Sequence, residues 1–233
     1  MALLTSDPRI IVLAFVGGII PSLLWLWFWL KEEGHSEPKG LLTIVFILGM
    51  IAVVIVLPIQ KFIQTYVNSE EFQIILWASA EEMLKFIAVL VVIYRTKYLS
   101  EPIDWPIYLI TAALGFAALE NTLFLIKPLS VSGATVSLLT GQLRFLGSTL
   151  LHTIASGTIG ITIGISFYMN NTRRKLYLFL GFLFAIALHS AFNFLIIRNN
   201  GNDFLQVFAF LWVVTIIIML LFEKVRRMSE IIN

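Results

Sequence analysis

The sequence predicts an all-α integral membrane protein, a polytopic bundle of about seven transmembrane helices with room for an eighth. Of its 233 residues, 59% are hydrophobic and 13% are charged, and the mean hydropathy is +0.92. Such a composition is typical of proteins embedded in a bilayer. The chain has no cysteine, which excludes disulfides and thiol chemistry. Its net charge of +2 is too small and too scattered to indicate nucleic-acid binding.

Seven stretches are long enough to cross a bilayer as helices, which takes about 20 residues. Residues 127–142, between the fourth and fifth stretches, fit a loop, a re-entrant segment, an extension of the fifth helix or a short eighth crossing. No connection is long enough for a soluble domain, so residues 1–233 are expected to form one transmembrane domain, with its motif-bearing core at about 72–197. The seven stretches are residues 10–30, 41–59, 72–94, 105–126, 143–169, 176–197 and 204–222.

The distribution of lysine and arginine predicts the orientation of these spans, because cytoplasmic loops are enriched in both residues. With seven spans, ten of these residues fall on one side and four on the other. The N-terminus is therefore expected outside and the C-terminus in the cytoplasm, in a multi-pass protein of the cell membrane. The more basic side carries Lys31, Lys39, Arg95, Lys97, Arg173, Arg174, Lys175, Lys224, Arg226 and Arg227, and the other side carries Arg9, Lys61, Lys127 and Arg198.

Glu81 and Glu82 stand side by side in the third stretch, with Lys85 one helical turn further on. Each ionisable residue at membrane depth costs roughly 2.5–3.5 kcal/mol on insertion scales, and two adjacent carboxylates also repel each other. An internal ion pair that locks two helices together would explain one glutamate, but it does not need the second. The pair therefore predicts a working site within the membrane.

Polar side chains at a similar depth follow in the next three stretches. Glu81, Glu120, His152 and His189 lie six to nine residues from the outward-facing ends of their spans. At a rise of about 1.5 Å per residue, all four sit roughly 9–14 Å below that boundary. They are expected to line a shared polar cavity open to the outer side; the alternative is a set of hydrogen bonds between helices, which are common in bundles. Two amides accompany them, Asn121 and Asn193.

Helical geometry separates the two glutamates, because successive residues of a helix point about 100° apart. One of Glu81 and Glu82 is expected to face the reacting centre while the other braces it, and the sequence leaves open which does which. Lys85 lies three and four residues away from them and can reach either carboxylate.

A glutamate and a histidine around one water molecule supply a general base and an electrostatic stabiliser for amide hydrolysis, and Asn193 could donate a hydrogen bond to the oxyanion that forms. Two histidines and a glutamate also match the ligand set of hydrolytic zinc sites. The sequence lacks a His-Glu-x-x-His motif and has no aspartate within the spans, which excludes the zincin arrangement and a di-aspartyl protease. If a divalent metal such as zinc binds, its candidate ligands are Glu81, Glu82, Glu120, His152 and His189.

Four motifs lie in order on four consecutive stretches: Glu-Glu-x-x-Lys at 81–85, Gly-Phe-x-x-x-Glu-Asn at 115–121, His152, and His-x-x-x-Asn at 189–193. Together they resemble the motif regions of the PrsW family of intramembrane proteases, which is related to the CPBP superfamily that contains the CAAX prenyl endopeptidases. Glu120 stands where the wider superfamily often has a histidine, so a metal-dependent and a metal-free mechanism both stay open.

The resemblance implies site-specific cleavage of a membrane-tethered protein substrate, in the best-known case a single-span anti-sigma factor that is cut on its extracytoplasmic side. Carried over by position, Glu81 or Glu82 would activate water, and His189 would assist. The catalytic candidates are thus Glu81, Glu82, Glu120, His152 and His189, and the candidates for support or oxyanion binding are Lys85, Asn121 and Asn193.

Two other classes of function fit some of the same residues. Intramembrane glutamate, histidine and lysine also mark proton relays, so a proton- or cation-coupled transporter is one alternative. Transporters more often show inverted repeats and broken helices, and the sequence shows no convincing pair of either. A non-catalytic membrane scaffold that binds a partner's span is the second alternative.

Overall fold

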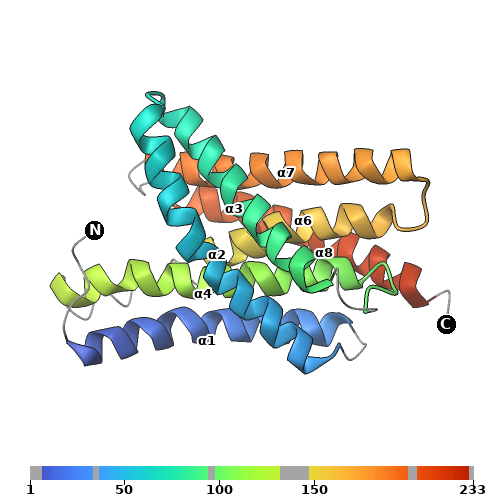
Figure 1. The fold of residues 1–233 in the computed structure, drawn as a ribbon, viewed down its shortest axis with the longest axis horizontal. Helices are drawn as coiled ribbons and strands as arrows, with labels where there is room; N and C mark the ends of the chain where they lie inside the picture. Colours follow the sequence, from blue (N-terminus) through green and yellow to red (C-terminus); the bar gives the residue numbers. More distant parts are fainter. Residues whose placement is uncertain (1–6, 34–36, 94–97, 132–146, 199–203, 231–233) are drawn as a thin grey trace.

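The computed structural model is all-α, as the sequence predicts (Figure 1). It describes residues 7–33, 37–93, 98–131, 147–198 and 204–230, and no strand occurs among them. The described helices are α1 (Pro8–Glu33), α2 (Lys39–Tyr66), α3 (Glu70–Ile93), α4 (Asp104–Val131), α6 (Thr149–Ile165), α7 (Asn171–Arg198) and α8 (Phe204–Glu230).

Five of these helices, α1, α2, α4, α7 and α8, are long and apolar enough to cross a membrane. Helix α3 has 24 residues, but Glu81, Glu82 and Lys85 interrupt its apolar sequence. Helix α6 is apolar and has 17 residues. Large hydrophobic side chains are exposed along α1, α2, α7 and α8, which is the arrangement expected where lipid replaces water. The chain is therefore a multi-pass membrane protein.

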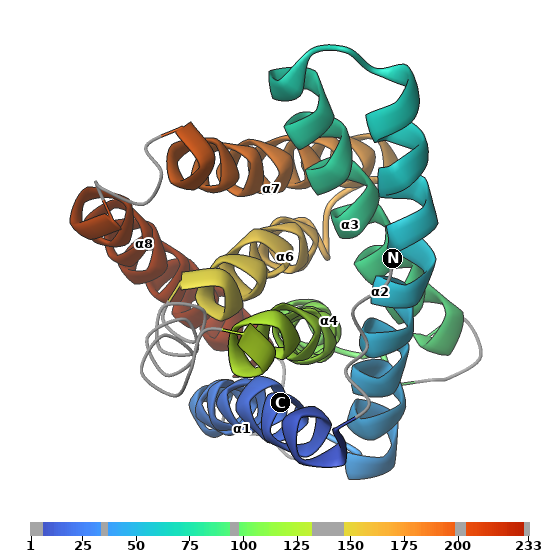
Figure 2. The same cartoon turned by 90° about the vertical axis from the view of Figure 1, so that its left-hand side faces the viewer.

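Helices α1, α4, α6 and α7 form a stack in that order, which is clearest when the bundle is viewed end-on (Figure 2). Helix α4 lies inside this stack and also packs against α2, and most of its residues are buried. Helix α8 packs mainly against α6. The interior of the stack is therefore formed by α4 and α6, the two helices that carry Glu120 and His152.

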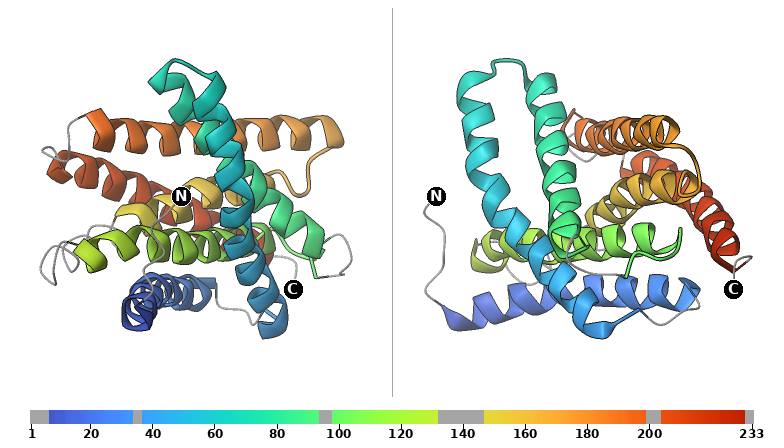
Figure 3. Two further views of the ribbon diagram at one scale, coloured as in Figure 1. Left: turned by 60° about the vertical axis from the view of Figure 1, so that its left-hand side comes forward. Right: turned by 45° about the vertical axis from the view of Figure 1, so that its right-hand side comes forward.

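Helices α2 and α3 form a hairpin that crosses one side of the stack at a steep angle (Figure 3, right). Helices α2 and α4 can approach closely where they cross because glycine, which has no side chain, occupies the contact positions. A Cβ atom on Gly49 would collide with the backbone carbonyl of Ala112, and one on Gly115 would collide with that of Phe46. Helix α3 packs against α4, α6 and α7 as well as α2, so the polar middle of α3 faces the interior of the bundle.

The helix ends differ from the predicted span ends, because a helix can continue after the apolar sequence has stopped. Helix α2 continues to Tyr66, seven residues beyond the predicted end of the second span at residue 59. Helix α4 continues through Pro128 to Val131, so the start of segment 127–142 is helical. Residues 132–142, and with them the choice between a loop and an eighth crossing, lie outside the described residues.

Candidate active site

A cluster of buried polar side chains lies where α3 meets α6 and α7. Glu81, Glu82 and Lys85 enter it from α3, His152 from α6 and His189 from α7, and none of the five is more than 4% exposed. Their convergence agrees with the common depth predicted from the sequence. Burial on this scale costs free energy unless each charged group finds partners, so the contacts of each residue indicate its role.

Glu82 is fully engaged by its neighbours. Its Oε1 accepts hydrogen bonds from Lys85 Nζ at 2.7 Å and from His189 Nδ1 at 2.9 Å. Its Oε2 accepts a hydrogen bond from Ser156 Oγ at 2.6 Å. A carboxylate held by a cation, an imidazole and a hydroxyl is well compensated for its burial. Glu82 thus holds the His189 ring through its Nδ1 nitrogen.

Glu81 is engaged on one oxygen only. Its Oε1 accepts a hydrogen bond from Gln60 Nε2, on α2, at 2.8 Å. Its Oε2, which we call the open oxygen, is buried and has no hydrogen-bond partner among the residues that the structure describes. The open oxygen lies 3.5 Å from His189 Nε2 and 4.0 Å from His152 Nδ1. A buried hydrogen-bond acceptor without a partner destabilises the fold by about 1–3 kcal/mol or more. A cation, a proton or a water molecule beside the open oxygen would remove this cost.

His152 is held at both ring nitrogens. Lys85 Nζ lies 2.8 Å from its Nδ1, and Glu120 Oε2 lies 3.1 Å from its Nε2. Because an ammonium group only donates and a carboxylate only accepts, Nδ1 is the acceptor and Nε2 carries the proton. The ring packs edge-on to that of His189, with the centroids 5.0 Å apart at 81°. The lone pair of His152 Nδ1 is therefore taken by Lys85, and the open oxygen lies 4.0 Å from the same nitrogen.

Glu81, His152 and His189 could hold a metal ion, since one ligand atom from each lies within 4.8 Å of the others. Zinc sites use this ligand set, with ligands about 2.0–2.2 Å from the metal. The outer nitrogen of each histidine is bonded to a carboxylate, Glu82 for His189 and Glu120 for His152, as is usual for histidines that ligate metals. The residues thus fit a divalent cation, although Lys85 must first release His152 Nδ1.

The remaining predicted residues surround this centre. Glu120 accepts a hydrogen bond from Ser148 Oγ at 3.2 Å, and its side chain is 19% exposed, the most of the cluster's acids. Asn121 Nδ2 donates to Thr149 Oγ1 at 2.8 Å and so links α4 to α6. Asn193 is half-buried on α7, one turn beyond His189.

Gln60 and Ser156, which bond to the two adjacent glutamates of α3, are absent from the sequence-based prediction. Ser156 lies four residues after His152 and hence on the same face of α6, which is a signal that the sequence does contain. Gln60 lies one residue beyond the predicted end of the second span at residue 59, and a search confined to the spans therefore omits it.

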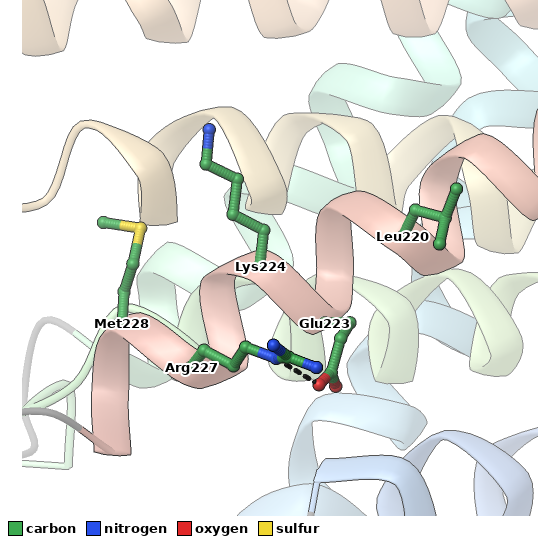
Figure 4. A pocket seen from close by; sticks show the side chains of 5 residues that line it. All are labelled: Leu220, Glu223, Lys224, Arg227 and Met228. Carbon is green, nitrogen blue, oxygen red and sulfur yellow. Dashed lines mark hydrogen bonds and ion pairs between the residues drawn. The ribbon is translucent and has the colours of Figure 1, made fainter.

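A surface pocket of about 420 Å³ lies on α8 (Figure 4). Its walls include Leu220, Lys224 and Met228, and an ion pair joins Arg227 Nε to Glu223 Oε1 at 2.7 Å. All of its lining residues come from α8, and none belongs to the polar cluster. The buried cluster, and not this surface pocket, therefore carries the candidate chemistry.

A polytopic helical membrane protein with a buried centre of glutamate and histidine has the features of an intramembrane protease. Residues 37–222 match the family described as "PrsW family intramembrane metalloprotease", and the chain belongs to this family. It is a membrane protease, so the comparisons support the protease prediction and not the transporter or the scaffold.

Curated relatives agree with this assignment. The chain is 27% identical over 191 residues to Protease PrsW of Clostridioides difficile (strain 630), with 78% of each chain covered. It is 29% identical over 205 residues to Protease PrsW of Bacillus subtilis (strain 168), with 84% of this chain and 88% of the relative covered. No solved structure is significantly similar to the chain.

Proposed function

We propose that the chain hydrolyses a peptide bond of a membrane-tethered protein, such as a single-span anti-sigma factor, at the open oxygen of Glu81. The observation that carries the proposal is this buried carboxylate oxygen, which faces His152 and His189 and has no hydrogen-bond partner in the described part of the chain. The cost of burying such an acceptor is understandable if substrate, water or a cation uses it during the reaction.

Three ligand atoms would hold a divalent cation such as zinc: the open oxygen, His152 Nδ1 and His189 Nε2. When bound, such an ion polarises the scissile carbonyl and makes water more acidic. The open oxygen has more than one lone pair, so it can also accept a proton from a water molecule beside it. The hydroxyl of that water adds to the carbonyl carbon, and the water's protons end on the new amine and carboxyl groups as the C–N bond breaks.

The surrounding residues hold this centre in place. Glu82, which is tied to Lys85 and Ser156, keeps the proton of His189 on Nδ1 and turns Nε2 toward the open oxygen. Glu120 holds His152 through the other ring nitrogen: it keeps the proton on Nε2 and leaves Nδ1 as the acceptor. The partial exposure of Glu120 lets it exchange protons between the cluster and water. We assign the half-buried Asn193 to the oxyanion, as a donor one turn from His189.

We further propose that residues 1–233 act as one domain in the cell membrane, with the catalytic core at about 72–197 and the C-terminus in the cytoplasm. The end of α1, the beginning of α7 and the end of α8 lie at one end of the bundle, and they carry Lys31, Arg174 and Arg227 (Figure 1). Basic residues gathered at one end favour the cytoplasmic side.

Single cysteines test the orientation, because the natural chain has none. Asn68, between α2 and α3, and Thr172, at the start of α7, are exposed. An impermeant maleimide should label Asn68→Cys in intact cells and Thr172→Cys only after permeabilisation. The reverse pattern would invert the topology.

Cleavage of a single-span substrate in lipid nanodiscs tests the function. Wild-type protein should cut the substrate, Glu81→Gln should reduce the rate at least about 1,000-fold, as expected for loss of a catalytic group, and Glu223→Gln, on the outer surface of α8, should leave it unchanged. Full activity of Glu81→Gln would overturn the proposal.

A further inference from the structure

We propose that Gln60 is a positioning residue of the active site, which fixes Glu81 so that the open oxygen points at His152 and His189. The inference rests on the proposed function, since it assigns a role to a neighbour of Glu81. Gln60 lies outside the four motif regions, on α2, which none of those motifs includes.

The contact is direct and well placed. Gln60 Nε2 donates to Glu81 Oε1 at 2.8 Å, and Glu81 is only 4% exposed. A carboxylate with one oxygen held in this way cannot rotate about its last bond without losing the hydrogen bond. Because Gln60 binds Oε1, the other oxygen, Oε2, is left as the open oxygen.

The chemistry of the donor matters as much as its position. Lys85 is the cation of the cluster, and it is bonded to Glu82 and His152. A second cation on Glu81 would neutralise the charge that the open oxygen offers to a metal ion or a proton. An amide donates a hydrogen bond without adding charge, so Gln60 orients the carboxylate and leaves its negative charge available.

Gln60 is itself held by the helix that carries Glu81. Trp77 Nε1 donates to the backbone carbonyl oxygen of Gln60 at 3.2 Å. Trp77 lies four residues before Glu81, so both side chains project from the same face of α3. These two bonds, one to the backbone of Gln60 and one from its side chain, fix α2 against α3 at the level of the active site.

A purely structural link between α2 and α3 would also use such bonds, and metal binding separates the two roles. Cobalt(II) is a suitable probe, because its visible absorption reports the ligands around it. The test compares wild-type protein with Gln60→Met, which has a side chain of similar length and no donor. Gln64→Met is the matched control, since Gln64 lies one turn further along α2 and is exposed.

We expect Gln60→Met to bind cobalt(II) about 10–100-fold more weakly than wild type, as is typical when a residue that orients a ligand is replaced. Its cobalt spectrum should change, its cleavage rate should fall, and Gln64→Met should match wild type in all three measurements. In a Glu81→Gln background, Gln60→Met should have no further effect on cobalt binding. If Gln60→Met does not fold, Gln60→Asn, which shortens the same amide by one methylene, should show weaker binding than wild type.

The outcomes distinguish this inference from the function on which it rests. If Glu81→Gln loses cobalt and cleavage while Gln60→Met equals Gln64→Met, the function holds and the role of Gln60 is overturned. If wild-type protein binds no cobalt and Glu81→Gln cleaves normally, the proposed function fails and the role of Gln60 falls with it.

Discussion

Glu81 and Glu82 are adjacent, both buried and chemically identical, yet their contacts differ. Glu82 has both oxygens bonded, to Lys85, His189 and Ser156. Glu81 has one oxygen bonded to Gln60 and keeps the other open toward the histidines. Under the proposed function, the difference assigns Glu82 to stability and Glu81 to the reaction, at a cost in stability that keeps the open oxygen available.

The largest effect is expected at Glu81, where activity and stability should change in opposite directions. Glu81→Gln should lower cleavage at least about 1,000-fold. In metal-free protein it should keep or raise the melting temperature, because an amide carries no buried charge. Cleavage by the untreated proteins and thermal unfolding of the same proteins after chelation test this. A clear loss of stability would contradict the division of roles.

Glu82→Gln should act mainly on stability. It leaves the Lys85 ammonium buried without its carboxylate partner, which costs about 3–5 kcal/mol for buried pairs. The unfolding midpoint should fall sharply, and cleavage should fall through loss of the His189 orientation. Replacement of both partners, Glu82→Gln with Lys85→Met, should recover much of the stability and little of the activity. An unchanged midpoint in the single variant would show that Glu82 is not the brace.

Ser156→Ala should give a smaller loss of the same kind. It removes one hydrogen bond to a charged acceptor, worth about 1.5–3 kcal/mol, while Lys85 and His189 still hold Glu82. Thermal unfolding and cleavage should both decline moderately. Thr158→Val is a control on the same helix, since the Thr158 hydroxyl donates to the backbone oxygen of Ile154, within its own helix. Equal effects of the two variants would argue against a specific role for Ser156.

Arg227→Gln should have the smallest effect. The ion pair of Arg227 with Glu223 lies on an exposed part of α8, where solvent and salt screen it. The melting temperature and the cleavage rate should equal those of wild type. A marked loss of activity would mean that the α8 surface contributes to the reaction.

The sequence was sufficient to predict that four of the cluster's residues meet, but not how they share their contacts. Glu81, Glu120, His152 and His189 lie at a similar depth in the membrane on four consecutive helices. Depth and helix order can both be obtained by counting residues along the apolar stretches, so the sequence predicts that these four residues lie together. The roles of Glu81 and Glu82 depend on the rotation of α3 about its own axis, which is set by its packing against α4, α6 and α7. A rotation of α3 by about 100° would exchange the orientations of Glu81 and Glu82. The pattern of apolar residues in so short a span does not determine this rotation.

Gln60 shows a second limit of reasoning from the sequence. Hydropathy ends the second span at residue 59, whereas α2 continues to Tyr66 and its inclined path brings Gln60 beside α3. The steep crossing depends on close backbone contacts at Gly49 and Gly115, which are distant in the sequence. Small residues indicate that helices approach closely, but they do not say which helices or at what angle.

The most direct test of the central claim is metal content and cleavage measured on one purified sample, before and after chelation. The account predicts about one divalent ion per chain, loss of both ion and activity with a chelator, and recovery of both on adding zinc. Glu81→Gln should retain its fold and bind no ion. A fully active preparation without metal would contradict the assignment of Glu81, His152 and His189 as metal ligands.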